Sequence, residues 1–295
     1  MAGDCLRYPG SLKLWLVCVI LALGLLFQIG CGRQQAQPLS PPPPRVSAEP
    51  VLVYCGNSMR TPMEELAQTY GAEKGVKVEI TYNDSGALLL MIEQTGKGDL
   101  YVCHDPFLYM LEGKQLGHGC TVAVLTPVIV VQKGNPKEIR GLTDLGREGL
   151  SLVMTDYEHS TLGNMLPTIF GKVGNEADIR RNIRTTVRSG GEAANSVSIG
   201  RFDAALVWNA VAFLRSDKLD VVPIAPELLP VPGVDAVTSA TGHSYDIGTI
   251  RVTIAVLNCS ARPKAAEAFL DFVASEQGKK VFKDFGFTPL REPQK

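Results

Sequence analysis

Apolar positions along the chain switch repeatedly between two spacings from residue 51 onward. Residues 51–54 and 76–82 are short apolar or alternating runs of strand type. Between them, residues 61–75 carry apolar side chains at helical spacing, with acidic residues in the first turns. A chain in which strand and helix patterns alternate in this way predicts an α/β fold with helices packed against its sheets.

The same two spacings predict the remaining elements. Further strands are expected at residues 100–103, 122–132, 151–155, 185–188, 204–208, 219–223 and 247–258. Further helices are expected at residues 86–95, 105–112, 142–145, 165–172, 178–184, 193–199, 264–275 and 278–285. The Pro- and Gly-rich stretch 229–244 is expected to be a loop.

Two long strands, residues 122–132 and 247–258, stand out from the shorter ones. Pro127 lies inside the first, where a proline indicates a bend or a change of sheet. The pair predicts two lobes joined by two crossover strands. Their expected limits are residues 51–127 plus 253–295 for lobe 1 and 128–252 for lobe 2. Such lobes enclose a cleft that closes by a hinge motion.

Several of the predicted strands lead into a polar turn and then a helix. Ser58 and Ser85 lie in the first two of these turns. Turns at the carboxyl ends of neighbouring parallel strands lie together, and a helix N-terminus attracts anions. Ser58 and Ser85 are therefore predicted to face one small ligand. The alternative is that Asp84 and Ser85 only cap their own helix.

Composition adds a near-neutral charge, 29 Lys and Arg against 30 Asp and Glu, which does not favour nucleic-acid binding. Basic Arg7 and Lys13 precede an apolar segment, so residues 1–30 are predicted to be a signal peptide. Cys31 follows as in the bacterial lipoprotein box and is predicted to be lipidated. An ordinary signal peptide and an uncleaved anchor helix are the alternatives.

Residues 31–50 are rich in Gln and Pro and show no apolar periodicity. They are predicted to be an extended tether, which with Cys31 places the protein in the periplasm or on the cell surface as a membrane-anchored lipoprotein.

Four cysteines remain beyond the tether: Cys55, Cys103, Cys120 and Cys259. An oxidising compartment permits up to two disulfides among them, and buried free thiols are the alternative. Their spacing does not fit a zinc knuckle.

Two histidines and two aspartates lie near predicted strand ends. His104 and His159 are interpreted as structural or surface residues without a catalytic role. Asp105 and Asp156 are interpreted as capping residues, with donor positioning or phosphate repulsion as alternatives.

The order and spacing of six stretches resemble the molybdate-binding proteins of ABC importers, within the type II periplasmic binding fold. The resemblance runs over residues 51–287 and implies two lobes, each a mixed sheet flanked by helices. The stretches are CGNSMRTPMEELA, AEKGVKVEITYNDSGALLLMIEQ, DLYVCHDPFLYMLE, VVQKGNPKEIRGLTDL, IGRFDAALVW and AEAFLDFVASEQGKKVFKDFGF.

The resemblance also implies a ligand site without catalytic residues. A molybdate or tungstate oxyanion would be held by the hydroxyls of Ser58 and Ser85, by backbone N–H groups near Leu162 and at Gly190, and by Trp208. Trp208 stands where the family has a tyrosine. The turn at Leu162 and the glycine at 190 also depart from the family pattern. Implied partners are ABC permease subunits, the protein being a monomer without a cofactor.

Three other functions remain open from the sequence. The site could take another anion such as sulfate or thiosulfate, or the chain could be an orphan sensor module. A hydrolase with Ser58 or Ser85 as nucleophile is the third, although the chain has no GxSxG elbow.

Overall fold

A computed structural model describes residues 49–111, 115–239 and 242–290. The predicted signal peptide at 1–30, the lipidation at Cys31 and nearly all of the tether at 31–50 lie outside these ranges. Within them, no helix combines the length and the apolar character that crossing a membrane requires.

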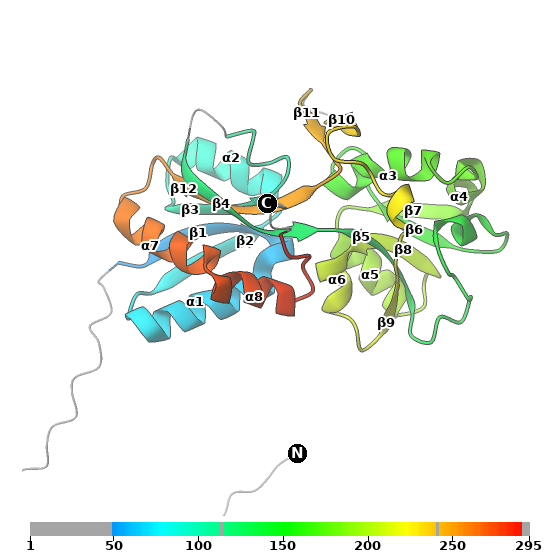
Figure 1. The fold of residues 1–295 in the computed structure, drawn as a ribbon, viewed down its shortest axis with the longest axis horizontal. Helices are drawn as coiled ribbons and strands as arrows, with labels where there is room; N and C mark the ends of the chain where they lie inside the picture. The colour runs from blue at the N-terminus through cyan, green and yellow to red at the C-terminus, as the bar shows by residue number, and fades with distance from the viewer. Residues whose placement is uncertain (1–48, 112–114, 240–241, 291–295) are drawn as a thin grey trace, which may run out of the picture. The chain divides into compact units, whose positions relative to one another are not determined.

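The described chain forms two five-stranded sheets and one two-stranded hairpin (Figure 1). The strands are β1 (Val51–Gly56), β2 (Val78–Asn83), β3 (Leu100–His104), β4 (Leu116–Leu125), β5 (Pro127–Gln132), β6 (Leu152–Thr155), β7 (Ile183–Val187), β8 (Ala204–Trp208), β9 (Leu219–Val222), β10 (Ala236–Thr238), β11 (Ser244–Asp246) and β12 (Ile250–Leu257). We call the sheet β2-β1-β3-β12-β4 with its helices lobe 1, and the sheet β7-β6-β8-β5-β9 with its helices lobe 2.

Each sheet is mixed, because four strands run in one direction and one strand runs against them. In lobe 1, β1 is parallel to β2 and β3, whereas β12 is antiparallel to β3 and β4. In lobe 2, β6 is parallel to β7 and β8, whereas β5 is antiparallel to β8 and β9. The predicted fold class, two mixed sheets flanked by helices, is confirmed.

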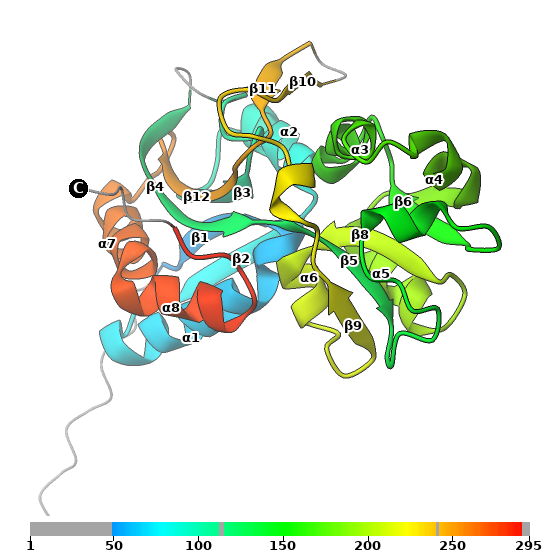
Figure 2. The same cartoon turned by 45° about the vertical axis from the view of Figure 1, so that its right-hand side comes forward.

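Helices cover both faces of each sheet. They are α1 (Arg60–Lys74), α2 (Ser85–Thr95), α3 (Thr161–Gly171), α4 (Glu176–Asn182), α5 (Gly190–Ser198), α6 (Asn209–Phe213), α7 (Pro263–Ala274) and α8 (Glu276–Asp284), with short 3-10 helices η1 (Asn57–Met59), η2 (Leu142–Gly146) and η3 (Pro226–Leu228). Figures 1 and 2 place α2 on one face of the lobe 1 sheet and α1, α7 and α8 on the other. In lobe 2, α3 and α4 lie on one face and α5 and α6 on the other.

Strand β3 shows how the sequence pattern produces this layering. Leu100 and Val102 belong to the apolar core shared with α1, whereas Tyr101 and Cys103 pack with α2. Successive side chains of a strand point to opposite faces, so an unbroken apolar run requires cover on both sides.

The predicted strand at 122–132 divides at Pro127. β4 ends at Leu125 in lobe 1 and β5 begins at Pro127 in lobe 2, so the change of sheet occurs at Thr126. The second crossing lies between β9 of lobe 2 and β12, which pairs within lobe 1 from Ile250 onward. The lobe limits given above remain predictions.

Two expectations about local structure were wrong. Residues 105–111 form successive turns instead of a helix, with N–H groups bonded three residues back, as from Tyr109 to the carbonyl of Pro106 at 3.1 Å. These bonds reach the carbonyl three residues back, whereas an α-helix requires bonds four residues back. The expected loop at 229–244 contributes the hairpin β10–β11.

Candidate anion-binding site

Ser58 and Ser85 lie at one edge of the lobe 1 sheet. β1 and β2 are parallel neighbours in which Gly56 pairs with Asn83. Each serine follows two residues after that pair, so both lie just beyond the carboxyl ends of adjacent strands. The structure thus brings the two serine turns together, as parallel register requires.

Direct contacts confirm that the two turns touch. Asn57 Nδ2 donates a hydrogen bond to Asp84 Oδ1 at 3.3 Å, joining the turn after β1 to the turn after β2. A Cβ atom added to Gly56 would lie 2.7 Å from Ser85 Oγ, so a glycine is needed for this approach. Asp84 occupies the N-cap of α2 but makes no side-chain capping bond. Its carboxylate therefore links the turns, and the capping alternative does not hold for Asp84.

Lobe 2 contributes the N-terminus of α3. Leu162 is the second residue of this helix and is buried, and the Ser160 side chain accepts the N–H of Gly163 at 3.3 Å. The N–H groups of a helix's first turn have no partner within the helix. The backbone N–H of Leu162 is one of these groups and is suited to an anion.

A second helix N-terminus, that of α5, begins at Gly190. The Ser189 hydroxyl accepts the N–H of Glu192 at 3.1 Å. This capping bond therefore goes to Glu192 and not to the N–H of Gly190. A Cβ atom at Gly190 would lie 3.8 Å from Val207, the residue before Trp208. Gly190 therefore lies beside the end of β8, where Trp208 is 5% exposed.

Thr155 ends β6 between these two helices. Its side chain is 1% exposed, and its hydroxyl has no hydrogen-bond partner among the described residues. An unpaired buried hydroxyl is costly, so native structures rarely keep one without a ligand or water. Thr155 was not singled out from the sequence, where one threonine at a strand end carries no signal.

Two contacts join the lobes at this place. Thr161 Oγ1, at the start of α3, donates to the backbone carbonyl of Asp105 at 3.3 Å. The rings of His104 and Trp208 lie 6.2 Å apart between centroids. Because β3 is the neighbour of β1, these contacts bring the lobe 2 residues to the sheet edge that carries Ser58 and Ser85.

The path from Ser85 to the other lobe is continuous. A Cβ atom at Gly86 would lie 3.4 Å from the Phe107 ring, and Phe107 meets His104 edge-on at 5.5 Å between centroids. His104 in turn faces Trp208. Neighbouring contacts thus run from the turn that carries Ser85 to Trp208 in lobe 2.

The carboxylates near the site are held by backbone groups. Asp105 is 3% exposed, accepts the N–H of Arg251 at 2.9 Å, and lies 3.8 Å from that guanidinium. Burial raises the pKa of Asp105, and the hydrogen bond and charge of Arg251 oppose the rise. Asp105 does not cap a helix, because the chain after it forms turns.

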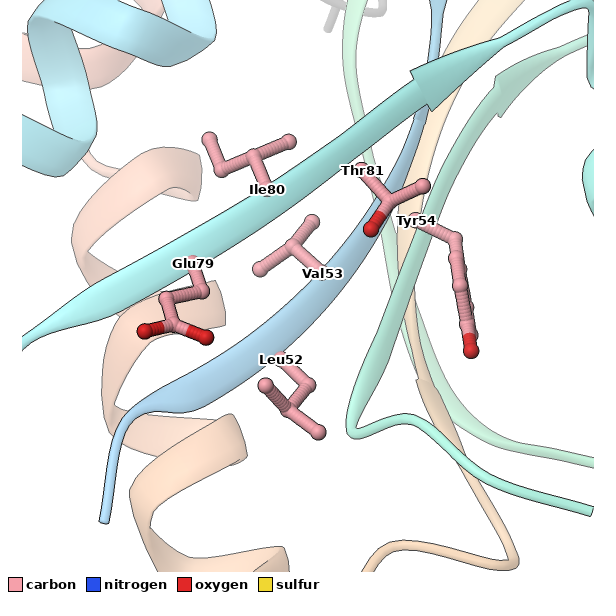
Figure 3. Close-up of a pocket in the computed structure, with 6 residues that line it drawn as sticks. All are labelled: Leu52, Val53, Tyr54, Glu79, Ile80 and Thr81. Atoms are coloured by element: carbon pink, nitrogen blue, oxygen red, sulfur yellow. The ribbon is translucent and has the colours of Figure 1, made fainter.

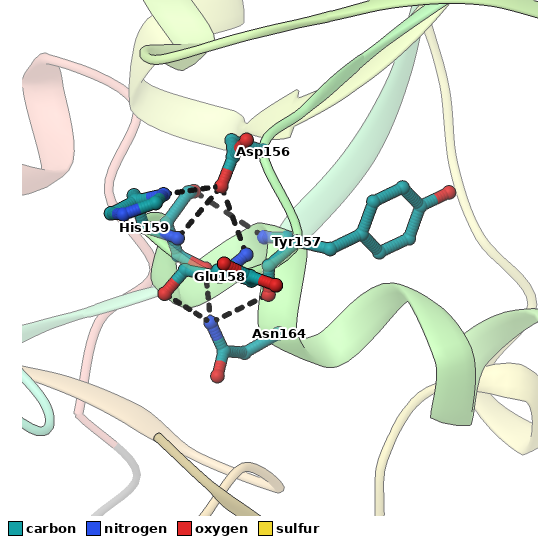
Figure 4. Close-up of polar contacts among 7 residues, drawn as sticks. Asp156, Tyr157, Glu158, His159 and Asn164 are labelled. Atoms are coloured by element: carbon teal, nitrogen blue, oxygen red, sulfur yellow. Dashed lines mark hydrogen bonds and ion pairs between the residues drawn. The ribbon is translucent and has the colours of Figure 1, made fainter. Parts of the chain in front are cut away.

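Asp156 organises the turn before α3 (Figure 4). Its Oδ1 accepts the N–H groups of Glu158 and His159, both at 2.9 Å, and lies 2.9 Å from His159 Nδ1. These bonds lower the pKa of Asp156. The side chain of Asn164 closes the same turn by donating to the carbonyl of Tyr157 at 3.0 Å. His159 is thereby a structural partner of this turn.

A hollow of about 360 Å³ lies elsewhere in lobe 1, along β1 and β2 (Figure 3). Its lining residues are Leu52, Val53, Tyr54, Glu79, Ile80 and Thr81. None of the five predicted site residues is among them, since those follow the strand ends.

All four cysteines of the described chain, Cys55, Cys103, Cys120 and Cys259, are free thiols. The free-thiol alternative therefore holds in this structure. Cys55 and Cys103 are fully buried, and burial raises the pKa of both.

Comparison with known families agrees with this geometry. Residues 51–288 match the family model described as bacterial extracellular solute-binding protein, which covers both lobes. The chain belongs to this family.

Individual relatives of this solute-binding protein align with most of its chain. The molybdate-binding protein ModA of Mycobacterium bovis is 27% identical over 286 residues, 96% of this chain and 99% of the relative. The substrate-binding domain of a putative molybdenum ABC transporter from Clostridium difficile has the same fold, with a TM-score of 0.63, 20% identity, and coverage of 82% of this chain and 99% of that one. The sulfate-binding protein SubI of Mycobacterium tuberculosis also shares the fold, with a TM-score of 0.60, 22% identity, and coverage of 81% and 86%.

His104 lies beside the serine turns of this solute-binding protein. Strand register places His104 at the level of Asn57, directly beside the serine turn, because Cys55 pairs with Val102. A single histidine after an apolar strand gave no reason to expect this position, which depends on the order of the strands.

Proposed function

We propose that this extracytoplasmic solute-binding protein captures a tetrahedral oxyanion between its lobes and passes it to an ABC importer. Molybdate and tungstate are the proposed ligands. The proposed contacts are the hydroxyls of Ser58 and Ser85, the backbone N–H groups of Leu162 and Gly190, and the indole N–H of Trp208.

The observation that carries the proposal is the convergence of donors from both lobes. The Asn57–Asp84 bond joins the serine turns, and the bond from Thr161 to the Asp105 carbonyl brings the start of α3 to the same sheet edge. Two helix N-termini and the unpaired Thr155 hydroxyl supply further donors from lobe 2. Converging donors without a cation are suited to a bare anion.

The energetics of such a site are favourable without a counter-charge. Each hydrogen bond to a charged group contributes about 1.5–3 kcal/mol beyond the water hydrogen bonds that it replaces, so several such donors together favour a bare anion. Ligand size then separates molybdate and tungstate from smaller anions.

We also propose a cellular location and a partner for the protein. Lipidation at Cys31 would anchor the protein in the membrane, and the tether at 31–50 would let a monomer reach its permease subunits. The Mycobacterium bovis molybdate-binding protein, matched over 99% of its own length, supports molybdate as the ligand.

Calorimetric titration of the purified protein with molybdate, tungstate, sulfate, thiosulfate and phosphate tests the function. Molybdate or tungstate should bind most tightly. Ser58→Ala and Ser85→Ala should each weaken binding by about 10- to 100-fold, because each removes one charge-assisted bond. Ser216→Ala, at an exposed serine, is the matched control and should leave affinity unchanged. No heat with any of the five anions would refute the proposal.

Sulfate is the second candidate, because the sulfate-binding protein SubI matches this fold over 81% of the chain, against 82% for the molybdenum transporter domain. The same titration separates the two. Sulfate binding tighter than molybdate would reassign the ligand while keeping the site.

A further inference from the structure

His104 lies beside the residues of the proposed site. It ends β3, level with Asn57 of the neighbouring strand, and its ring faces Trp208 of lobe 2. Unlike the five proposed contacts, its side chain changes charge near neutral pH.

The hydrogen bond of His104 fixes its tautomer. Nδ1 lies 2.8 Å from the carbonyl oxygen of Asp105, and a carbonyl can only accept. Nδ1 therefore carries the proton, and in the neutral ring Nε2 is a bare acceptor. No hydrogen bond from a described residue reaches Nε2.

We infer that His104 couples the capture of a bare dianion to the uptake of one proton. A solvent proton adds to the Nε2 lone pair, and the resulting N–H donates to the dianion. An oxyanion that already carries a proton, such as hydrogen phosphate, instead donates a hydrogen bond from its own O–H to Nε2. Its binding then takes up no proton from the solvent. This inference rests on the proposed site and specifies its ligand chemistry.

The surroundings of His104 keep the ring neutral while the site is empty. Burial lowers the pKa of His104, and the only opposing influence is the hydrogen bond to the Asp105 carbonyl. The Asp105 carboxylate is engaged by the Arg251 backbone, and on the neighbouring strand pair Asp84 is bonded to Asn57.

The remaining neighbours do not change this balance. Phe107, Trp208 and Thr161, on the adjoining turn, β8 and α3, are uncharged. A dianion would therefore be the first strong negative charge at the ring, and it would raise the proton affinity of Nε2.

Calorimetry in two buffers of different ionisation enthalpy measures the proton count directly. At about pH 7.5 the wild-type protein should take up close to one proton with molybdate or sulfate, and its affinity should fall by up to about tenfold per pH unit at higher pH. His104→Gln should show no uptake and a nearly pH-independent affinity. His118→Gln, on the exposed histidine paired with Glu267, is the control and should behave as wild type.

Proton uptake near zero in the wild-type protein with a dianion bound would overturn the inference. Uptake that persists in His104→Gln would overturn it as well. Binding of no oxyanion at all would refute the proposed function itself, which is a distinguishable result. If His104→Gln does not fold, as thermal melting would show, the wild-type proton count and His104→Asn decide the question.

Discussion

Trp208 at the proposed site is held in place by burial and by packing against a neighbouring ring. Trp208 shows how a substitution within the family pattern keeps the chemistry of a donor, since an indole offers one N–H and no acceptor. Its ring is 5% exposed and packs beside His104. Different substitutions can therefore separate the packing of Trp208 from the binding role that we propose for it.

Trp208→Phe should weaken oxyanion binding by about 10- to 100-fold, because it removes one donor to a charged ligand. Trp208→Tyr should retain most of the affinity, since the phenol is again a donor. Calorimetry measures both variants, and urea unfolding should show a loss under about 1.5 kcal/mol for Phe. Equal affinity of the Phe variant and wild type would remove Trp208 from the site.

Asp105 yields a prediction about pH. Its pKa is raised in the folded protein, so the folded state holds the proton more tightly than the unfolded chain does. The stability that Asp105 contributes is then greatest below about pH 3.9 and is lost as the pH rises through the folded pKa.

Asp105→Asn keeps an acceptor for the Arg251 N–H and removes the buried charge. We expect it to be at least as stable as wild type at about pH 8, with this advantage shrinking toward about pH 4. Urea unfolding across that range measures the difference. Asp156→Asn should show the opposite sign, because the pKa of Asp156 is lowered. A constant difference for Asp105→Asn at all pH values would contradict the argument.

Among the secondary-structure elements, the start of α3 is the most constrained. A Cβ atom at Gly163 would lie 1.8 Å from the carbonyl oxygen of Asp156, which the turn before the helix holds in place. The helix can approach this turn only with glycine at that position. The position of Leu162 therefore depends on its neighbour.

Gly163→Ala should destabilise the protein by more than about 2 kcal/mol and weaken oxyanion binding, because α3 must move away from the turn. Gly171→Ala, at the other end of the same helix, meets nothing within 4 Å. It should be neutral or stabilising by up to about 1 kcal/mol from helix propensity. Thermal melting and calorimetry compare the pair, and equal effects of the two substitutions would contradict this account of α3.

Helices and strands with a clear spacing of apolar residues could be predicted from the sequence, whereas the turns at 105–111 could not. α1 buries the apolar face expected from its spacing, with Met63, Leu66 and Tyr70 inside. The turns at 105–111 were expected to be helical because Asp105-Pro106 is typical of a helix start. The observed bonds instead run three residues back, so the segment forms successive turns.

For the whole molecule, the described contacts join the two lobes near the crossovers as well as at the site. Thr126 Oγ1 lies 2.7 Å from Thr288 Oγ1, and Asn209 Nδ2 donates to the same Thr288 hydroxyl at 3.0 Å. The C-terminal segment is thereby fastened where the chain passes from lobe 1 to lobe 2. A ligand held by both lobes should therefore stabilise the protein as a unit.

Saturating molybdate or tungstate, at about 100 times the dissociation constant, should add about 2.7 kcal/mol to the free energy of unfolding. For a chain of this size the melting temperature should rise by about 5–10 °C. Differential scanning calorimetry tests this, with nitrate as a planar control anion. The shift should shrink in Ser85→Ala, and an equal shift with nitrate would indicate a nonspecific salt effect.

The sequence by itself determined the succession of strands and helices, the sheet change at Pro127 and the serines at two turns, because these depend on local spacing and backbone chemistry. Tertiary structure alone decided that β3 lies beside β1, which places His104 level with Asn57, and that the buried Thr155 hydroxyl has no partner among the described residues. Strand order and burial result from packing between segments far apart in the chain, and no local pattern contains that information.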